Sequence, residues 1–164
     1  MGSFDDVLAS NEKYAAQFTD TGLPGQARKG LAVVTCMDSR IDPLHMLGLE
    51  PGEAKILRNA GGRVTDDVLR TLVLATHLLG VNRVLVVEHT DCKMASATDD
   101  QVHQTIYEAS GIDTRSLEFR TMDDQRATLI GDVQRVCSSP YLPKDTAVGG
   151  FLYDVRTGRL SQVV

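Results

Sequence analysis

Apolar residues follow two alternating patterns along this chain. Short continuous runs, such as 31–35 and 84–87, predict strands buried on both faces, and apolar residues repeated every three or four positions predict amphipathic helices. The predicted strands cover 31–35, 54–57, 84–87, 147–155 and 160–164, and the predicted helices cover 4–18, 42–47, 65–79, 99–110 and 122–137. This alternation favours a single α/β domain over residues 1–164, with a mainly parallel sheet of four to five strands flanked by helices.

The first predicted helix, within residues 3–19, stands apart from the alternating pattern. A loop rich in Gly and Pro at 21–25 separates it from the first strand. The helix precedes that strand and has no obvious partner inside its own chain. We therefore expect it to pack on a partner subunit, and packing on its own domain is the alternative.

Composition and charge narrow the function classes. The chain has 164 residues, 42% of them hydrophobic and 24% charged, and its net charge of −5 gives no footprint for nucleic acid or an anionic membrane surface. No apolar run approaches the ~20 residues of a membrane span. The N-terminus has neither a basic region nor an apolar region typical of a signal peptide, so we expect a cytoplasmic protein.

Cysteine usage points to chemistry rather than to cross-links. The chain has three cysteines, an odd number, and a cytoplasmic protein keeps its thiols reduced. Disulfides therefore explain Cys36 and Cys92 poorly, and these two residues are expected to be metal ligands or nucleophiles. We expect Cys137, at a helix end, to be a small buried hydrophobic residue.

Reactive side chains gather where two predicted strands end. Cys36, Asp38 and Arg40 follow the first strand, and His89 and Cys92 follow the third. In open α/β sheets, sites form beyond the carboxyl ends of the strands, and neighbouring strands lie about 4.8 Å apart. Two thiolates and one imidazole suit a tetrahedral zinc ion, and three protein ligands leave the fourth position open, as in catalytic sites.

The residues beside these ligands have two possible arrangements. Asp38 could accept a hydrogen bond from a water on the metal while Arg40 holds its carboxylate in a bidentate pair. The same carboxylate could instead bind zinc directly and close the site. Arg58 and the turn after it could line the same opening with backbone N–H groups, and we assign Gly61 and Gly62 to substrate binding.

Three motifs together resemble one enzyme family. Cys-x-Asp-Ser-Arg from Cys36, Arg-Asn-Ala-Gly from Arg58 and His-x-x-Cys from His89 are similar, in this order and spacing, to the β-class carbonic anhydrases of the compact bacterial branch. The resemblance implies zinc on Cys36, His89 and Cys92, with Asp38 and Arg40 as the catalytic pair. It also implies a homodimer or homotetramer with its active site near the subunit interface.

The function that this resemblance implies is hydration of carbon dioxide to bicarbonate and a proton by zinc-bound hydroxide. Related zinc sites hydrolyse carbonyl sulfide or carbon disulfide, and the sequence does not separate these substrates from CO₂. Two features depart from the family: Lys93 stands where Gly is common after the second cysteine, and the chain has no Trp. Because of Lys93, a zinc-binding homologue without catalytic activity stays an alternative interpretation.

Other interpretations of the same residues are weaker. A phosphatase-like loop needs about five residues between Cys and Arg, but only three separate Cys36 from Arg40. The dinucleotide-binding spacing G-x-G-x-x-G is absent near Gly61. We expect Asp91 to be solvated or to cap a turn. The isolated histidines are expected to be structural; these are His45, His77 and His103.

Overall fold

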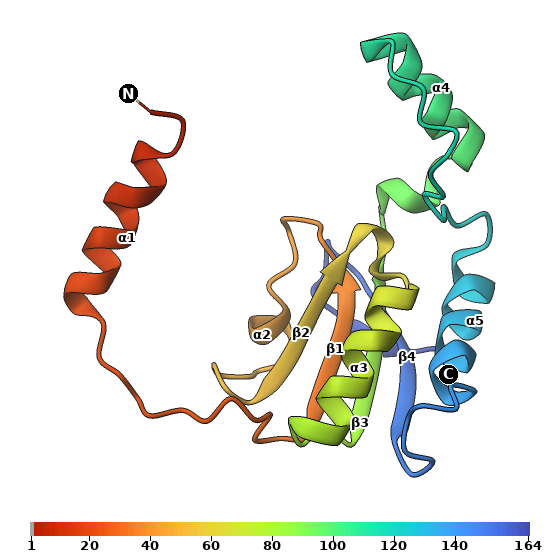
Figure 1. Ribbon diagram of the computed structural model, residues 1–164. Helices are drawn as coiled ribbons and strands as arrows, with labels where there is room; N and C mark the ends of the chain where they lie inside the picture. Colours follow the sequence, from red (N-terminus) through yellow and green to blue (C-terminus); the bar gives the residue numbers. More distant parts are fainter. Residues whose placement is uncertain (1) are drawn as a thin grey trace.

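The computed structural model of the protein describes residues 2–164. It contains a five-stranded sheet in the order β2-β1-β3-β4-β5, in which β1 to β4 are parallel and β5 is antiparallel to β4 (Figure 1). The strands are β1 Leu31–Cys36, β2 Ala54–Asn59, β3 Arg83–His89, β4 Ala147–Tyr153 and β5 Leu160–Gln162. The helices are α1 Asp5–Gln17, α2 Pro43–Met46, α3 Asp66–Leu78, α4 Asp99–Ser110 and α5 Gln125–Cys137. The predicted α/β fold with a mainly parallel sheet is confirmed.

Two helices cover one face of the sheet. Apolar residues of α3 and α5 pack on the alternate residues of β1 and β3 that point to this face, and together they form the main core. The core residues are Ala32, Val34, Val84 and Val86 of the strands with Val68, Leu72, Ala75, Leu129, Val133 and Val136 of the helices. The opposite face carries Leu31, Val33 and Val87 and is covered mainly by residues 46–49 around α2.

The element boundaries differ from the predicted ones where polar residues extend a strand or delay a helix. β3 continues through Glu88 to His89, so His89 is the last residue of the strand rather than part of the following loop. The helix predicted from residue 122 begins at Gln125, because the carboxylate of Asp124 caps it by accepting from the N–H of Ala127 at 2.9 Å.

Cys137 is exposed, so the prediction that it is buried is wrong. The buried residues of α5 are Leu129, Asp132, Val133 and Val136, and Cys137 falls on the adjoining outer face. The isolated histidines have structural or solvent contacts. His77 pairs with the carbonyl of Tyr141, His103 with the hydroxyl of Thr114, and the side chain of His45 is 93% exposed.

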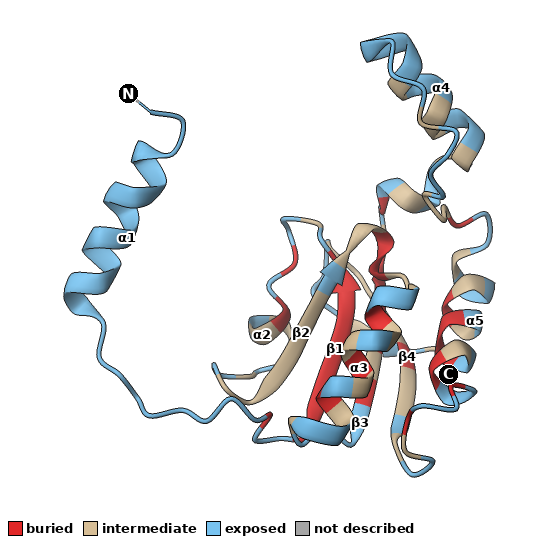
Figure 2. Ribbon diagram, viewed as in Figure 1, coloured by how far each residue is buried: buried red, intermediate tan, exposed pale blue. Residues whose placement is uncertain are grey.

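α1 lies away from the rest of the domain, at the end of a long extended segment (Figures 1 and 2). Every residue of this helix is exposed, including apolar side chains that would normally be covered. The exposed apolar residues in and beside it are Phe4, Val7, Leu8, Tyr14 and Phe18. The helix therefore finds no cover on its own domain.

A second projection is formed by α4 and the segment 111–121 that returns along it (Figure 1), and we call it the α4 arm. Thr98 and Gln101 form a capping box at the start of the helix, and Gly111, with φ of 70°, ends it. The carboxylate of Asp99 accepts from the backbone N–H groups of Phe119 and Thr121, which ties the returning segment to the helix. Among the described residues, no helix is long and apolar enough to cross a membrane.

Candidate metal centre

Two neighbouring parallel strands bring three ligand side chains to one edge of the sheet. Cys36 is the last residue of β1, His89 is the last residue of β3, and Cys92 follows three positions later. Their ligand atoms all lie within 4.8 Å of one another, and all three side chains are buried. Among the residues that the structure describes, this is the group of side chains that could hold a metal ion.

The hydrogen bonding of His89 prepares one ring nitrogen for a metal. Nδ1 lies 2.8 Å from the backbone oxygen of Thr90, so we assign the proton to Nδ1 and the lone pair to Nε2. Nε2 is fully buried and has no hydrogen-bond partner among the described residues. An imidazole nitrogen left unpaired in this way, beside two free thiols, fits a bound metal ion.

The pKa values of the two thiols shift in opposite directions because the thiols interact with each other. The hydrogen bond from Cys92 lowers the pKa of Cys36 below its ordinary value, although burial opposes the shift. The bond to Cys36, together with burial, raises the pKa of Cys92. A bound cation would favour the thiolate form of both residues.

Asp38 and Arg40 form a bidentate ion pair at the mouth of this group. Arg40 donates from Nε to Oδ1 of Asp38 at 3.0 Å, from Nη2 to Oδ2 at 2.8 Å and from its backbone N to Oδ1 at 2.9 Å. These bonds hold the pKa of Asp38 well below its usual range, so the carboxylate is ionised. Its Oδ2 lies 3.9 Å from Nε2 of His89. Of the two predicted arrangements, the structure contains the one in which Arg40 holds Asp38.

Comparisons with known proteins identify the family. The sequence model described as carbonic anhydrase matches residues 31–160. Beta-carbonic anhydrase 1 of Mycobacterium tuberculosis is 41% identical over 162 residues, covering 97% of this chain and 96% of that protein. The crystal structure of carbonic anhydrase from Streptococcus mutans has a TM-score of 0.92 and 36% identity, covering 100% of this chain and 99% of that chain. The chain belongs to the β-carbonic anhydrase family.

This membership confirms the resemblance drawn from the three motifs, and the chain is an enzyme of the β-carbonic anhydrase family. A second group of relatives is named for a different activity. The carbon disulfide hydrolase of Acidianus sp. is 32% identical over 180 residues, covering 95% of this chain and 86% of that protein.

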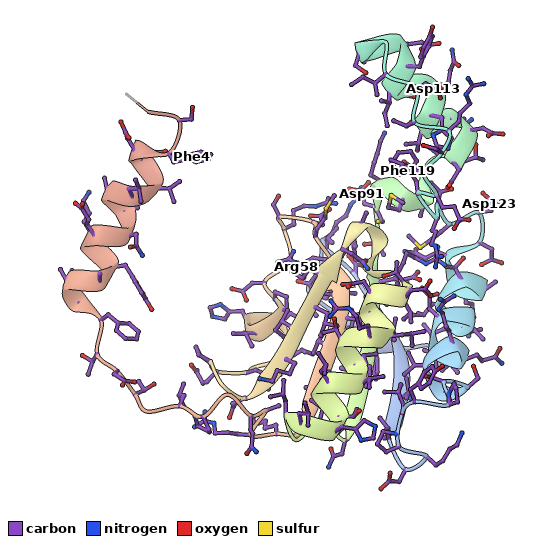
Figure 3. All side chains as sticks on the ribbon, in the orientation of Figure 1. Phe4, Arg58, Asp91, Asp113, Phe119 and Asp123 are labelled. Atoms are coloured by element: carbon purple, nitrogen blue, oxygen red, sulfur yellow. The ribbon has the colours of Figure 1, made fainter. Side chains whose placement is uncertain are left out.

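Arg58 of this β-carbonic anhydrase braces the loop that carries the ion pair. It donates from Nε to the backbone oxygen of Cys36 at 2.9 Å and from Nη2 to that of Asp38 at 2.6 Å. Figure 3 labels Arg58 beside the carboxyl end of β2. The sequence predicted that Arg58 lines the opening, and the structure adds these two bonds to the backbone.

Gly61 and Gly62 form a tight turn against the end of β1, which carries Cys36. Both have positive φ, 79° and 69°, and both are buried. A Cβ on Gly62 would lie 2.9 Å from the carbonyl oxygen of Val87 and 3.0 Å from the backbone N of Cys36, so only glycine fits there. The backbone of Gly61 also contributes to lowering the pKa of Cys36. The turn thus lies directly on the strand ends that carry the ligands.

Two acidic residues have partners or surroundings that the sequence did not predict. Asp91, expected to be solvated or to cap a turn, forms an ion pair of 2.7 Å with Arg40, 51 positions away. Glu88 is fully buried on the opposite side of β3 from His89, and burial raises its pKa to about 8. The alternation along β3 could have identified the direction of Glu88, but no local signal could have paired Asp91 with Arg40.

Proposed function

We propose that this protein hydrates carbon dioxide to bicarbonate and a proton at a zinc ion held by Cys36, His89 and Cys92. Two sulfurs and one nitrogen are ligands that zinc prefers, and tetrahedral zinc would separate them by about 3.5 to 3.8 Å. That spacing is compatible with ligand atoms that all lie within 4.8 Å. When bound, zinc supplies a Lewis acid that makes water a nucleophile near neutral pH.

The residues of the chain provide the remaining requirements of the reaction. The ionised carboxylate of Asp38 accepts a hydrogen bond from the attacking water and orients one of its lone pairs toward the carbon of CO₂. Arg40 keeps Asp38 ionised and in place through its three hydrogen bonds. We assign Gly61 and Gly62 to substrate binding, because their buried turn lies beside the three ligands. The released proton passes to buffer.

The observation that carries this proposal is the position of the Asp38–Arg40 pair, 3.9 Å from the unpaired Nε2 of His89. Stopped-flow measurement of CO₂ hydration by zinc-loaded protein tests it, with metal content measured in the same samples. Cys92→Ser should lose both zinc and activity, whereas Cys137→Ser, at an exposed cysteine, should retain both. Background hydration rates at every pH above neutral would refute the proposal.

Hydrolysis of carbonyl sulfide or carbon disulfide is the second candidate function. The observation that favours it is the group of relatives named carbon disulfide hydrolase, of which one is 32% identical to this chain. These gases are small linear molecules whose carbon would be attacked in the same way. Sulfide release from each gas, measured beside CO₂ hydration under the same conditions, decides between the two functions.

We also propose that the protein works as a homodimer or homotetramer in which α1 packs on a partner subunit. The apolar side chains of α1 are uncovered, and α3 carries a hollow of 590 Å³ lined by Leu69, Val73, Leu74 and Tyr141. A second copy of α1 would cover that apolar surface. One matched chain, at 19% identity and a TM-score of 0.71, comes from crystal structures of two tetrameric β-carbonic anhydrases of Sordaria macrospora.

Light scattering after size-exclusion chromatography tests the assembly. Leu8→Asp places a charge on the apolar face of α1 and should reduce the mass to that of one chain. Glu12→Ala, a substitution of a polar residue on the same helix, should leave the oligomer intact. A monomeric wild-type protein would refute this part of the proposal.

We place the protein in the cytoplasm, because reducing conditions keep Cys36 and Cys92 available to a metal.

A further inference from the structure

Arg40 binds a second carboxylate in addition to Asp38. Its Nη1 donates to Oδ2 of Asp91 at 2.7 Å, and its Nη2 donates to the backbone oxygen of Asp91 at 3.0 Å. Asp91 lies between the two ligands His89 and Cys92, beyond the carboxyl end of β3 (Figure 3). Arg40 therefore connects the loop after β1 to the loop that carries Cys92.

The same Asp-x-Arg ion pair occurs elsewhere in the molecule. Arg115 donates to Asp113 from Nε at 2.9 Å, from Nη2 at 2.6 Å and from its backbone N at 3.1 Å, which repeats the pattern of Arg40 and Asp38. This second pair lies on the exposed α4 arm, away from the metal ligands (Figure 3). An Asp-x-Arg sequence can thus form the bidentate pair without a metal site beside it, although the spacing does not suffice, because Arg156 contacts Asp154 only through its backbone N at 2.8 Å. The position of such a pair relative to a metal site must come from additional contacts.

The bonds to Asp91 are such a contact. Among the described residues, the side chain of Arg115 is bonded only to Asp113, whereas that of Arg40 is also bonded to Asp91. Asp91 has a φ of 57°, in the left-handed region that aspartate tolerates better than most side chains and glycine tolerates without strain. Aspartate at this position combines that backbone shape with a carboxylate that reaches Arg40.

We propose that Asp91 is a positioning residue that fixes the Asp38–Arg40 pair relative to the three metal ligands. Its catalytic meaning rests on the proposed function. Without the carboxylate of Asp91, Arg40 would keep Asp38 but lose one of its two attachments to the loop between His89 and Cys92. Asp38, whose Oδ2 lies 3.9 Å from Nε2 of His89, would then move with Arg40 and reach the metal more often.

Three variants separate positioning from folding and from charge. Asp91→Gly removes the carboxylate, suits the positive φ and keeps the backbone oxygen that Arg40 contacts. Asp113→Gly breaks the matching pair on the α4 arm and serves as the control. Asp91→Asn removes the charge but keeps an oxygen acceptor for Nη1 of Arg40.

Each variant is tested by steady-state CO₂ hydration of the zinc enzyme and by the visible absorption spectrum of the Co(II)-substituted protein, which reports the ligands on the metal. Asp91→Gly should lower kcat by about tenfold and change KM by less than about twofold. The loss is smaller than that expected for a buried positioning residue, because the side chain of Asp91 is 61% exposed. Asp91→Gly should also alter the Co(II) spectrum. In the Asp38→Asn background the same substitution should leave the spectrum unchanged, since no carboxylate then reaches the metal.

Asp113→Gly should match the wild type in every measurement, and Asp91→Asn should retain most of the kcat. The proposal is overturned if Asp91→Gly keeps the wild-type kcat and spectrum, if Asp113→Gly has the same effect, or if Asp91→Asn loses as much as Asp91→Gly. A wild-type enzyme without CO₂ hydration would refute the proposed function alone. The Co(II) spectra require no turnover and would still decide the role of Asp91.

Discussion

Glu88 is a carboxylic acid buried between the sheet and α5, and replacing it with Gln should change how stability depends on pH. Its side chain is fully buried, and neither carboxyl oxygen has a hydrogen-bond partner among the described residues. Burial, with the nearby Asp132 carboxylate, raises its pKa from 4.5 to about 8, although Arg63 opposes the shift. The neutral acid is therefore the form that the folded protein favours.

The direction of the effect follows from proton linkage. A raised pKa in the folded state means that the folded protein holds this proton more tightly than the unfolded chain does, so stability is lost as pH rises from about 4.5 to about 8. At 1.36 kcal/mol per pKa unit, the loss from Glu88 grows by roughly 2 to 3 kcal/mol between about pH 6 and pH 8.5. This is a substantial part of the 5 to 15 kcal/mol that stabilises a typical domain.

Urea denaturation of metal-saturated protein, followed by circular dichroism at one protein concentration, measures this loss. Gln at position 88 cannot ionise. The free energy of unfolding of Glu88→Gln, relative to that of the wild type, should therefore rise by roughly 2 to 3 kcal/mol across that pH range. Glu118→Gln, at a side chain that is 78% exposed, is the control and should not change the slope. Parallel stability curves for the wild type and Glu88→Gln would refute the reasoning.

Three further substitutions test other parts of the structure. Asp132→Ala removes a buried carboxylate and leaves the half-buried Arg63 without its charged partner. It should lower the free energy of unfolding by about 3 kcal/mol in urea denaturation, whereas Asp113→Ala, at an exposed pair, should change it little. Gly62→Ala should reduce the zinc content. In calorimetry it should also lower the stability by well over the 1 to 2 kcal/mol or so expected for Gly111→Ala. Both glycines have positive φ, but only Gly62 lies against backbone atoms. Lys93→Gly should change kcat/KM by less than about threefold, because this side chain is exposed and its short 3₁₀ turn needs no glycine; a larger gain would show that Lys93 obstructs the site.

The order of elements was predictable because local patterns specify it. Continuous apolar runs identified β1, whose six residues are all buried, and β3, in which five of seven residues are buried. Thr65 identified the start of α3 through the cap that it provides. The end of β3 was not predictable in the same way. Glu88 and His89 are polar, but the sheet includes them because β4 supplies a partner for each, Leu152 and Tyr153. Tertiary pairing there overrides the local preference.

The group formed by Cys36, His89 and Cys92 could be predicted, but its surroundings could not. Cys36, His89 and Cys92 follow from strand ends and ligand chemistry, and the structure brings all three together. Asp132, which binds Arg63 and the N–H of Val64 from a helix 69 positions later, gives no sign of this role in the sequence. A helix face with one acid in an apolar stripe has the same pattern whether that acid is solvated or paired in the core.

The two Asp-x-Arg pairs show why a motif alone does not define a site. Residues 38–40 and 113–115 have the same spacing and the same three hydrogen bonds. Only the first pair follows a strand whose neighbour in the sheet ends in His89, and only the first is bonded to Arg58 on one side and to Asp91 on the other. The local sequence therefore supplies an ionised carboxylate in both places. The parallel register of β1 and β3 places one of those carboxylates beside the Cys-His-Cys group that could hold a metal ion.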